Sequence, residues 1–250
     1  MSTKAIEIIK KLNAIENSKN VKGMARFGIT PKTKVLGVSI YVLRPMAKQI
    51  KKEVKDTHKL ALELWKTTIK SGKTGIHEAR LLAVFIENPI DVTEKQMEKW
   101  VKDFDSWDIC DQATTSLFDQ TPLAFKKALE WSKREKEFEK RAGFAMMAGL
   151  SVHDKKTEDK MFYPFFDAIK REAKDERNYV KKAVNWALRN IGKSRNKNLY
   201  KLAVKTANEL KKIDSKSSRW IANDALRELL SENIVKRINT KKQFDTPPSC

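Results

Sequence analysis

Apolar residues recur at intervals of three and four along nearly the whole chain, and only 8 glycines and 7 prolines interrupt them among 250 residues. This spacing places apolar side chains on one face of an α-helix, whereas a half-buried strand alternates apolar and polar residues. The pattern predicts an all-α protein. The expected helices cover residues 4–12, 39–54, 57–69, 76–87, 93–104, 107–118, 122–133, 135–150, 157–173, 176–191, 198–211 and 217–230.

Three of these helices resemble one another. The segment that begins at Lys140-Arg141 aligns with the segment that begins at Lys181-Lys182, 41 residues later, and Arg219-Trp220 begins a third copy 38 residues beyond that. These offsets lie near the period of about 40 residues of HEAT and armadillo repeats, in which paired helices stack and one helix of each pair lines a concave face. We therefore expect Arg141 and Lys182 to project from adjacent repeats. Apolar helices also resemble one another by composition alone, so coincidental similarity is the alternative.

The repeat pattern predicts a single domain over residues 1–235. The following segment, 236–250, contains Lys236-Arg237 and Lys241-Lys242 and ends in Pro-Pro-Ser-Cys. Because it has lost the helical periodicity, we expect a flexible basic tail. The tail could add affinity for phosphate groups or could be an ordinary solvated terminus.

Positive charge dominates the composition. The 52 Lys and Arg residues against 32 Asp and Glu residues give a formal net charge of +20, and the isoelectric point is near 9.8. Such an excess favours a polyanion as partner, because each phosphate that is neutralised by a basic side chain releases counterions. A basic surface that binds no ligand is the alternative.

The sequence gives little support for a membrane, secreted, disulfide-rich or metal-binding protein. No apolar run approaches the roughly 18 residues of a membrane span and the first residues lack a signal-peptide core, so we expect a cytoplasmic location and no membrane partner. Cys110 and Cys250 cannot form a disulfide framework or a four-ligand zinc site. The three histidines, His58, His77 and His153, have no metal-ligand spacing, and no metal site is predicted.

One expected helix combines an aromatic residue with a carboxylate. Trp107 and Asp111 are four residues apart and share a helix face, whereas Asp108 is rotated by about 100° and should point elsewhere. Asp105 and Ser106 precede this helix as candidate caps. An aromatic face beside a carboxylate in a basic protein suits a nucleotide. The alternative is that Trp107 packs into the core and Asp111 accepts a hydrogen bond from the next helix.

A second tryptophan lies among basic residues. Trp186 borders the apolar face of the 176–191 helix, with Lys182 and Arg189 on adjacent turns. An aromatic side chain in this position can stack on a base or a deoxyribose. It can equally lie at the seam between two repeats. Asp175 and Gly192 are the expected ends of this helix.

The order and spacing of these residues resemble the AlkD family of DNA glycosylases, over roughly residues 24–230. Trp107 and Asp111 match the active-site Trp and Asp of the family, and Trp186 matches its second Trp. Arg141 matches the phosphate-binding Arg, with Arg134 as the competing position. Family members often carry a further aromatic residue just before the first motif Trp, and this chain has Ser106 there.

The resemblance implies a HEAT-like α-solenoid with a concave basic face and a monomeric enzyme. The enzyme would excise N3- and N7-alkylated purines from duplex DNA without a metal or organic cofactor and leave an abasic site. Asp111 would oppose the oxocarbenium charge that develops on the sugar, and Trp107 and Trp186 would contact the sugar and backbone. The DNA-binding residues would be Arg141, Lys182 and Arg189.

Two other classes of function stay open. A protein of this superfamily could keep the basic groove and bind particular DNA structures without glycosylase activity. A helical scaffold for other proteins is the third possibility, because one fold can serve unrelated functions.

Overall fold

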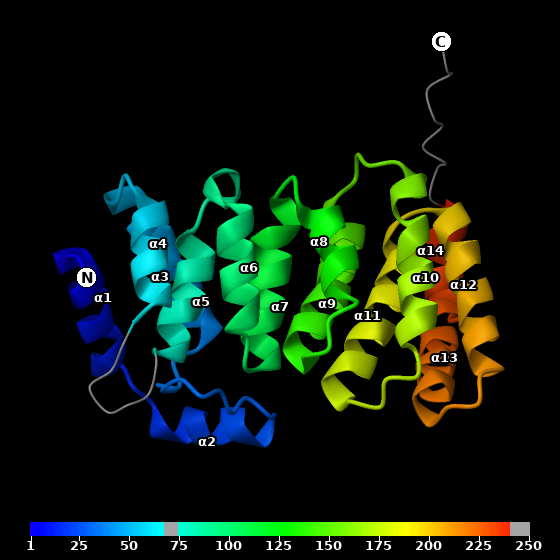
Figure 1. Cartoon of the computed structure of the whole chain (residues 1–250), viewed down its shortest axis with the longest axis horizontal. Coiled ribbons are helices and arrows are strands. Elements are labelled where there is room, and N and C mark those ends of the chain that lie inside the picture. The colour runs from blue at the N-terminus through cyan, green and yellow to red at the C-terminus, as the bar shows by residue number, and fades with distance from the viewer. Residues whose placement is uncertain (68–74, 241–250) are drawn as a thin grey trace, which may run out of the picture. The chain divides into compact units, whose positions relative to one another are not determined.

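The computed structural model describes residues 1–67 and 75–240. These residues form fourteen α-helices and three 3₁₀ helices and contain no β-strand, which confirms the all-α prediction (Figure 1). Backbone contacts group the chain into two compact units, Met1–Leu123 and Ala124–Cys250. None of the helices in the described ranges is both long and apolar enough to cross a membrane.

The first unit contains seven α-helices. They are α1 (Thr3–Ala14), α2 (Ser18–Arg26), α3 (Ile40–Glu53), α4 (Thr57–Trp65), α5 (His77–Ile86), α6 (Glu94–Lys102) and α7 (Trp107–Ser116). Helix α5 is buried along nearly its whole length and packs against α3, α4 and α7. Large aromatic side chains fill the core beside it, where Trp65 and Trp100 stack at 4.0 Å between ring centroids. Helix α7, which begins the candidate site, packs directly against α5.

A buried carboxylate anchors the segment between α2 and α3. Glu78 of α5 is fully buried and accepts hydrogen bonds from the backbone N–H groups of Leu36, Gly37 and Val38 at 2.7–3.3 Å. Gly37 has φ +77°, and a Cβ there would lie 2.3 Å from the carbonyl oxygen of Asn17. Only glycine therefore fits this turn, which returns the chain from α2 to the bundle.

The second unit continues with seven further α-helices. They are α8 (Ala124–Trp131), α9 (Glu137–His153), α10 (Tyr163–Glu172), α11 (Asn178–Ser194), α12 (Lys197–Lys211), α13 (Lys216–Leu229) and α14 (Glu232–Thr240). Helices α9, α11 and α13 pack side by side in one layer, while α8, α10 and α12 form a second layer against them (Figure 1). The three helices that resemble one another in sequence are thus consecutive neighbours in space.

Side-chain hydrogen bonds also join neighbouring repeats of the second unit. Asn185 Nδ2 of α11 donates to Asp224 Oδ2 of α13 at 2.6 Å, across 39 residues. Ser217 Oγ donates to the carbonyl oxygen of Asp175 at 2.8 Å, across 42 residues. These separations lie near the period of about 40 residues, as expected for stacked HEAT-like repeats.

Some helices differ from the prediction. The expected 157–173 helix is divided into a 3₁₀ turn, Asp159–Met161, and α10, because Pro164 at the start of α10 lacks an N–H group and favours a helix beginning. The 57–69 helix ends at Trp65. Helix α2 was not predicted, and none of its residues is buried. Within the described part of the chain, α14 covers residues 236–240 of the expected tail, while residues 241–250, Cys250 included, lie outside the described residues.

Gly192 does not end its helix. Helix α11 continues to Ser194, and Gly192 lies inside it, where a Cβ would be 2.8 Å from side-chain atoms of Ala203 and Leu229. The prediction of a C-terminal cap was therefore wrong. The glycine instead allows α11 to approach the neighbouring helices closely.

The division into a domain over 1–235 and a tail stays a prediction.

Candidate nucleic-acid interface

The six residues singled out by sequence fall into two groups. Trp107 and Asp111 belong to the first unit, on α7, whereas the other four belong to the second unit, on α9 and α11.

Trp107 is half-buried in the first turn of α7. Its indole Nε1 donates a hydrogen bond of 3.0 Å to the backbone carbonyl oxygen of Phe27. The bond connects the start of α7 to the residue that ends α2. Trp107 is therefore held in one orientation by a polar contact at the surface and is not an ordinary core residue.

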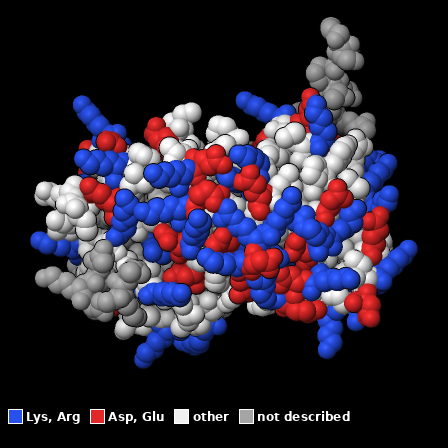
Figure 2. All heavy atoms as spheres, viewed as in Figure 1, with Lys and Arg blue, Asp and Glu red and all other residues white. Residues whose placement is uncertain are grey.

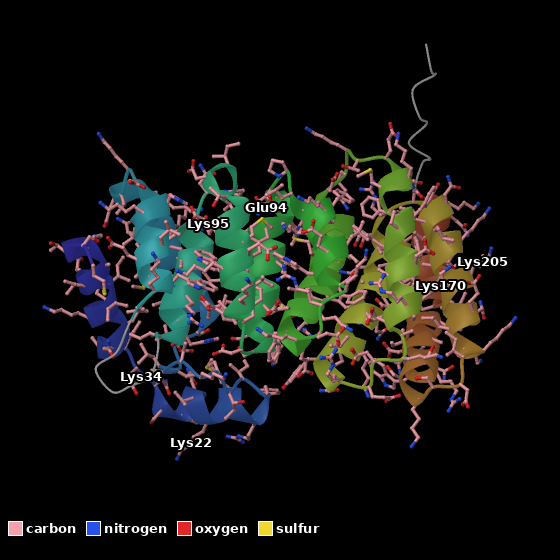
Figure 3. The ribbon with its side chains drawn as sticks, in the orientation of Figure 1. Lys22, Lys34, Glu94, Lys95, Lys170 and Lys205 are labelled. Atoms are coloured by element: carbon pink, nitrogen blue, oxygen red, sulfur yellow. The ribbon has the colours of Figure 1, made fainter. Side chains whose placement is uncertain are left out.

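Phe27 is the residue of this site that the sequence reasoning missed. Its side chain is 78% exposed, although a phenylalanine loses the benefit of burial there. Helix α2, which ends beside it, carries basic side chains, and Lys22 extends outward from it (Figure 3). A single aromatic residue between Arg26 and Gly28 gives no periodic signal, so only the hydrogen bond to Trp107 identifies it.

The two carboxylates of α7 have different surroundings. Asp111 is half-buried one turn after Trp107, and its backbone carbonyl accepts a hydrogen bond of 2.8 Å from Thr115 Oγ1. Asp108 is buried with 6% exposure and accepts a hydrogen bond of 2.6 Å from His77 Nε2 of α5. The prediction that Asp108 points away from Trp107 and Asp111 is confirmed.

Asp108 also determines how α7 begins. Ser106 occupies the N-cap position, as predicted, but its hydroxyl donates to the carboxylate of Asp108 and makes no hydrogen bond to the helix backbone. Asp105 Oδ2 accepts the backbone N–H of Lys32 at 2.8 Å and ties the preceding loop to the 31–38 segment. The carboxylates of Asp105 and Asp108 therefore both have hydrogen-bond partners within the protein.

The His77–Asp108 pair shifts the pKa of both groups. Burial by itself lowers the pKa of His77, but the hydrogen bond to Asp108 and the nearby carboxylates outweigh it, so the pKa lies above its ordinary value of 6.5. Burial raises the pKa of Asp108, but the hydrogen bond and charge of His77 together with the Ser106 hydroxyl bring it below 3.8. The pair holds α5 against α7 as a buried ion pair.

A basic strip on α3 lies next to α7. Arg44, Lys48 and Lys51 line an open depression together with Phe85, and the Arg44 guanidinium lies 4.6 Å from the centre of the Phe85 ring. Arg44 Nη2 donates to Gln112 Oε1 at 2.9 Å, which places this charge beside the residue that follows Asp111. The strip can receive phosphate groups of a strand that passes α7.

Arg141 is buried against the next repeat. Its side chain on α9 is 6% exposed, and Nη1 donates a hydrogen bond of 2.7 Å to the carbonyl oxygen of Tyr179, near the start of α11. The competing Arg134 binds Glu139 at 2.9 Å and is less buried. Neither guanidinium is as open as the sequence suggested for a phosphate ligand.

The basic residues of α11 are not equivalent. Lys182 is exposed and has no ion-pair partner among the described residues, and Trp186 lies half-buried one turn further along. Arg189 instead forms ion pairs with Glu228 at 2.5 Å and Asp224 at 3.6 Å, both on α13. Lys182 is therefore the better candidate for a direct phosphate contact, while Arg189 joins α11 to α13.

Basic and acidic side chains alternate over the face in Figure 2. Lys and Arg atoms there lie among Asp and Glu atoms and do not gather into one uninterrupted patch. On that face, many basic side chains thus have acidic side chains as neighbours. In residues 1–67 and 75–240, no three His, Cys, Asp or Glu side chains are grouped so as to hold a metal ion.

Comparisons with known proteins agree with this architecture. A family model described as DNA alkylation repair enzyme matches residues 8–229. A solved structure described as "A new family of proteins related to the HEAT-like repeat DNA glycosylases with affinity for branched DNA structures" superposes with a TM-score of 0.71 at 21% sequence identity, covering 92% of this chain and 96% of that one. At that identity the superposition establishes the HEAT-like helical fold. No curated protein shows a significant match.

Proposed function

The chain belongs to the DNA alkylation repair enzyme family, and from this premise we propose that it is a monofunctional DNA glycosylase that releases N3- and N7-alkylated purines from duplex DNA. Such bases carry a positive charge and leave readily once the glycosidic bond breaks. The protein's task is then to stabilise the deoxyribose, which acquires oxocarbenium character as the bond opens.

The observation that carries this proposal is the combination of aromatic surface and carboxylate at the start of α7. The Trp107 indole is oriented by its 3.0 Å hydrogen bond to Phe27, whose own ring is largely exposed. Asp111 follows one turn later on the same helix face. We assign Asp111 the role of opposing the developing sugar charge and orienting water. Trp107 and Phe27 would contact the damaged nucleotide, whose cationic character favours aromatic faces.

The basic residues would bind the backbone. On α3, Arg44, Lys48 and Lys51 are placed to receive phosphates next to α7. On α11, the exposed Lys182 would bind a phosphate and Trp186 would contact a sugar. Arg141 and Arg189, which have partners within the protein, would support these contacts by fixing α9, α11 and α13.

Incubation with duplex DNA methylated at purine nitrogens tests the proposal. Chromatography of the supernatant should reveal free N3-methyladenine and N7-methylguanine, and the DNA should contain abasic sites that are cleaved by later alkali treatment. Unmethylated DNA of the same sequence is the control. Binding of methylated DNA without release of any base would contradict the proposed activity.

The similarity to a protein described as having affinity for branched DNA favours a second candidate, a structure-specific DNA-binding protein without glycosylase activity. The two candidates differ in a simple experiment. A binding protein would prefer a four-way junction over a linear duplex and release no base, whereas a glycosylase would turn over methylated duplex.

A further inference from the structure

Trp220 occupies the third equivalent position in the row formed by α9, α11 and α13. In the sequence alignment of these helices, Trp220 is equivalent to Lys182, and Lys182 is equivalent to Arg141. The three helices pack side by side within the second unit. The equivalent positions along the row thus hold the buried Arg141, the exposed Lys182 and Trp220, and the sequence pattern indicated a role for the first two alone.

The environment of Trp220 is unlike that of a core tryptophan. Its side chain is 39% exposed, whereas the apolar residues that anchor α13, among them Ile221 and Ala225, are fully buried. Its indole N–H has no hydrogen-bond partner among the described residues. The ammonium group of Lys181 lies 5.6 Å from the ring centre, within the range of a cation–π contact. Packing of α13 therefore does not account for a large aromatic side chain here.

The charges around Trp220 are also distinctive. The residues aligned with Lys181 on the neighbouring helices are both neutralised by carboxylates. Lys140 binds Glu172 at 2.5 Å, and Arg219 binds Asp214 at 2.9 Å. Lys181 and Lys182 have no such partner in the part of the chain that the structure describes. An exposed indole with an unneutralised lysine, Lys181, over its ring and a second, Lys182, next in the sequence provides the combination that binds a nucleic-acid strand through stacking and phosphate contacts.

We propose that Trp220 stacks on an unpaired nucleobase of DNA while Lys181 and Lys182 bind the phosphates that flank it. This inference rests on the proposed binding of DNA. Bases inside an intact duplex are already covered on both faces by their neighbours, whereas a base in a single-stranded extension or at a junction has a free face. Trp220 would thus give the protein a preference for DNA in which a duplex meets a single strand.

Fluorescence anisotropy with two labelled DNAs of equal phosphate number tests this inference, one a blunt duplex and the other a duplex with a single-stranded overhang. At one fixed salt concentration, the wild-type protein should bind the overhang DNA about 10-fold more tightly. Trp220→Ala should remove this preference and retain the affinity for the blunt duplex. Trp220→Phe should retain most of the preference, since a phenyl ring still stacks.

Tyr163→Ala is the matched control, because Tyr163 of α10 is a similarly exposed aromatic residue of the same unit, at 48%. It should leave both affinities unchanged. Equal binding of the two DNAs by the wild-type protein, or an undiminished preference in Trp220→Ala, would overturn the role of Trp220 and leave the proposed function intact. A wild-type protein that binds neither DNA would overturn the proposed function and this inference together.

Discussion

At the scale of single residues, the two carboxylates of α7 have different roles: Asp108 is structural, and Asp111 is the proposed catalytic group. Asp108 is buried and paired with His77 at 2.6 Å, whereas Asp111 lies half-buried beside Trp107. Removing one partner of a buried ion pair leaves an uncompensated charge and costs about 3–5 kcal/mol. Asp108→Asn should therefore lower the free energy of unfolding by about 3 kcal/mol, and Asp111→Asn, at a half-buried position, should lower it by less. Urea denaturation of both variants measures this contrast, and equal destabilisation would contradict it.

The same pair predicts how stability depends on pH. His77 has a raised pKa, so its stabilisation is complete below about pH 6.5 and is lost as the pH rises through the folded-state pKa. Asp108 has a lowered pKa, so its stabilisation is complete above about pH 3.8 and is lost as the pH falls through the folded-state pKa. The difference in unfolding free energy between wild type and Asp108→Asn should thus be greatest between about pH 4 and 6.5. A difference that stays constant up to pH 9 would refute the ion pair.

At the scale of helices, two glycines should respond oppositely to the same substitution. A Cβ at Gly143 of α9 would lie 2.4 Å from the backbone nitrogen of Ser132 and 2.8 Å from the carbonyl oxygen of Ala128, so α8 would have to move. Gly23 of α2 has no atom within 4 Å of such a Cβ. We expect Gly143→Ala to lower the free energy of unfolding by about 1–3 kcal/mol. Gly23→Ala should raise it by up to about 1 kcal/mol, through helix propensity. Similar effects at both positions would show that α8 and α9 are less closely packed.

Helices buried on one face could be predicted from sequence, and those without a buried face could not. Helix α7 begins at Trp107, as the periodicity and Ser106 indicate, whereas α2 is short, mostly polar and has no buried residue. The role of Phe27 depends on a backbone carbonyl 80 residues from Trp107, and sequence spacing says nothing of such a contact. Arg189 was expected to face DNA, yet its partner Glu228 lies 39 residues away on α13. Partners of that kind depend on how the repeats stack.

For the molecule as a whole, the charge of +20 predicts a strongly salt-dependent affinity for DNA. On duplex DNA, the logarithm of the binding constant should fall with the logarithm of salt concentration by about 0.9 per phosphate neutralised. Lys182→Gln should reduce this slope by about one unit. Lys205 of α12, in the other layer of the second unit, is the matched control for charge (Figure 3). Lys205→Gln should leave the slope unchanged, and equal reductions in both variants would indicate a diffuse charge effect.

The proposed glycosylase activity depends above all on Asp111, which would take part in releasing alkylated purines from DNA. Single-turnover excision of N7-methylguanine from methylated duplex, with protein in excess, measures it most directly in wild type and Asp111→Asn. We expect excision to slow by roughly 100-fold or more, the scale of losing one electrostatic contact in a transition state, while DNA affinity is retained or increases. A folded Asp111→Asn protein that releases methylated purines at the wild-type rate would rule out the catalytic role of Asp111.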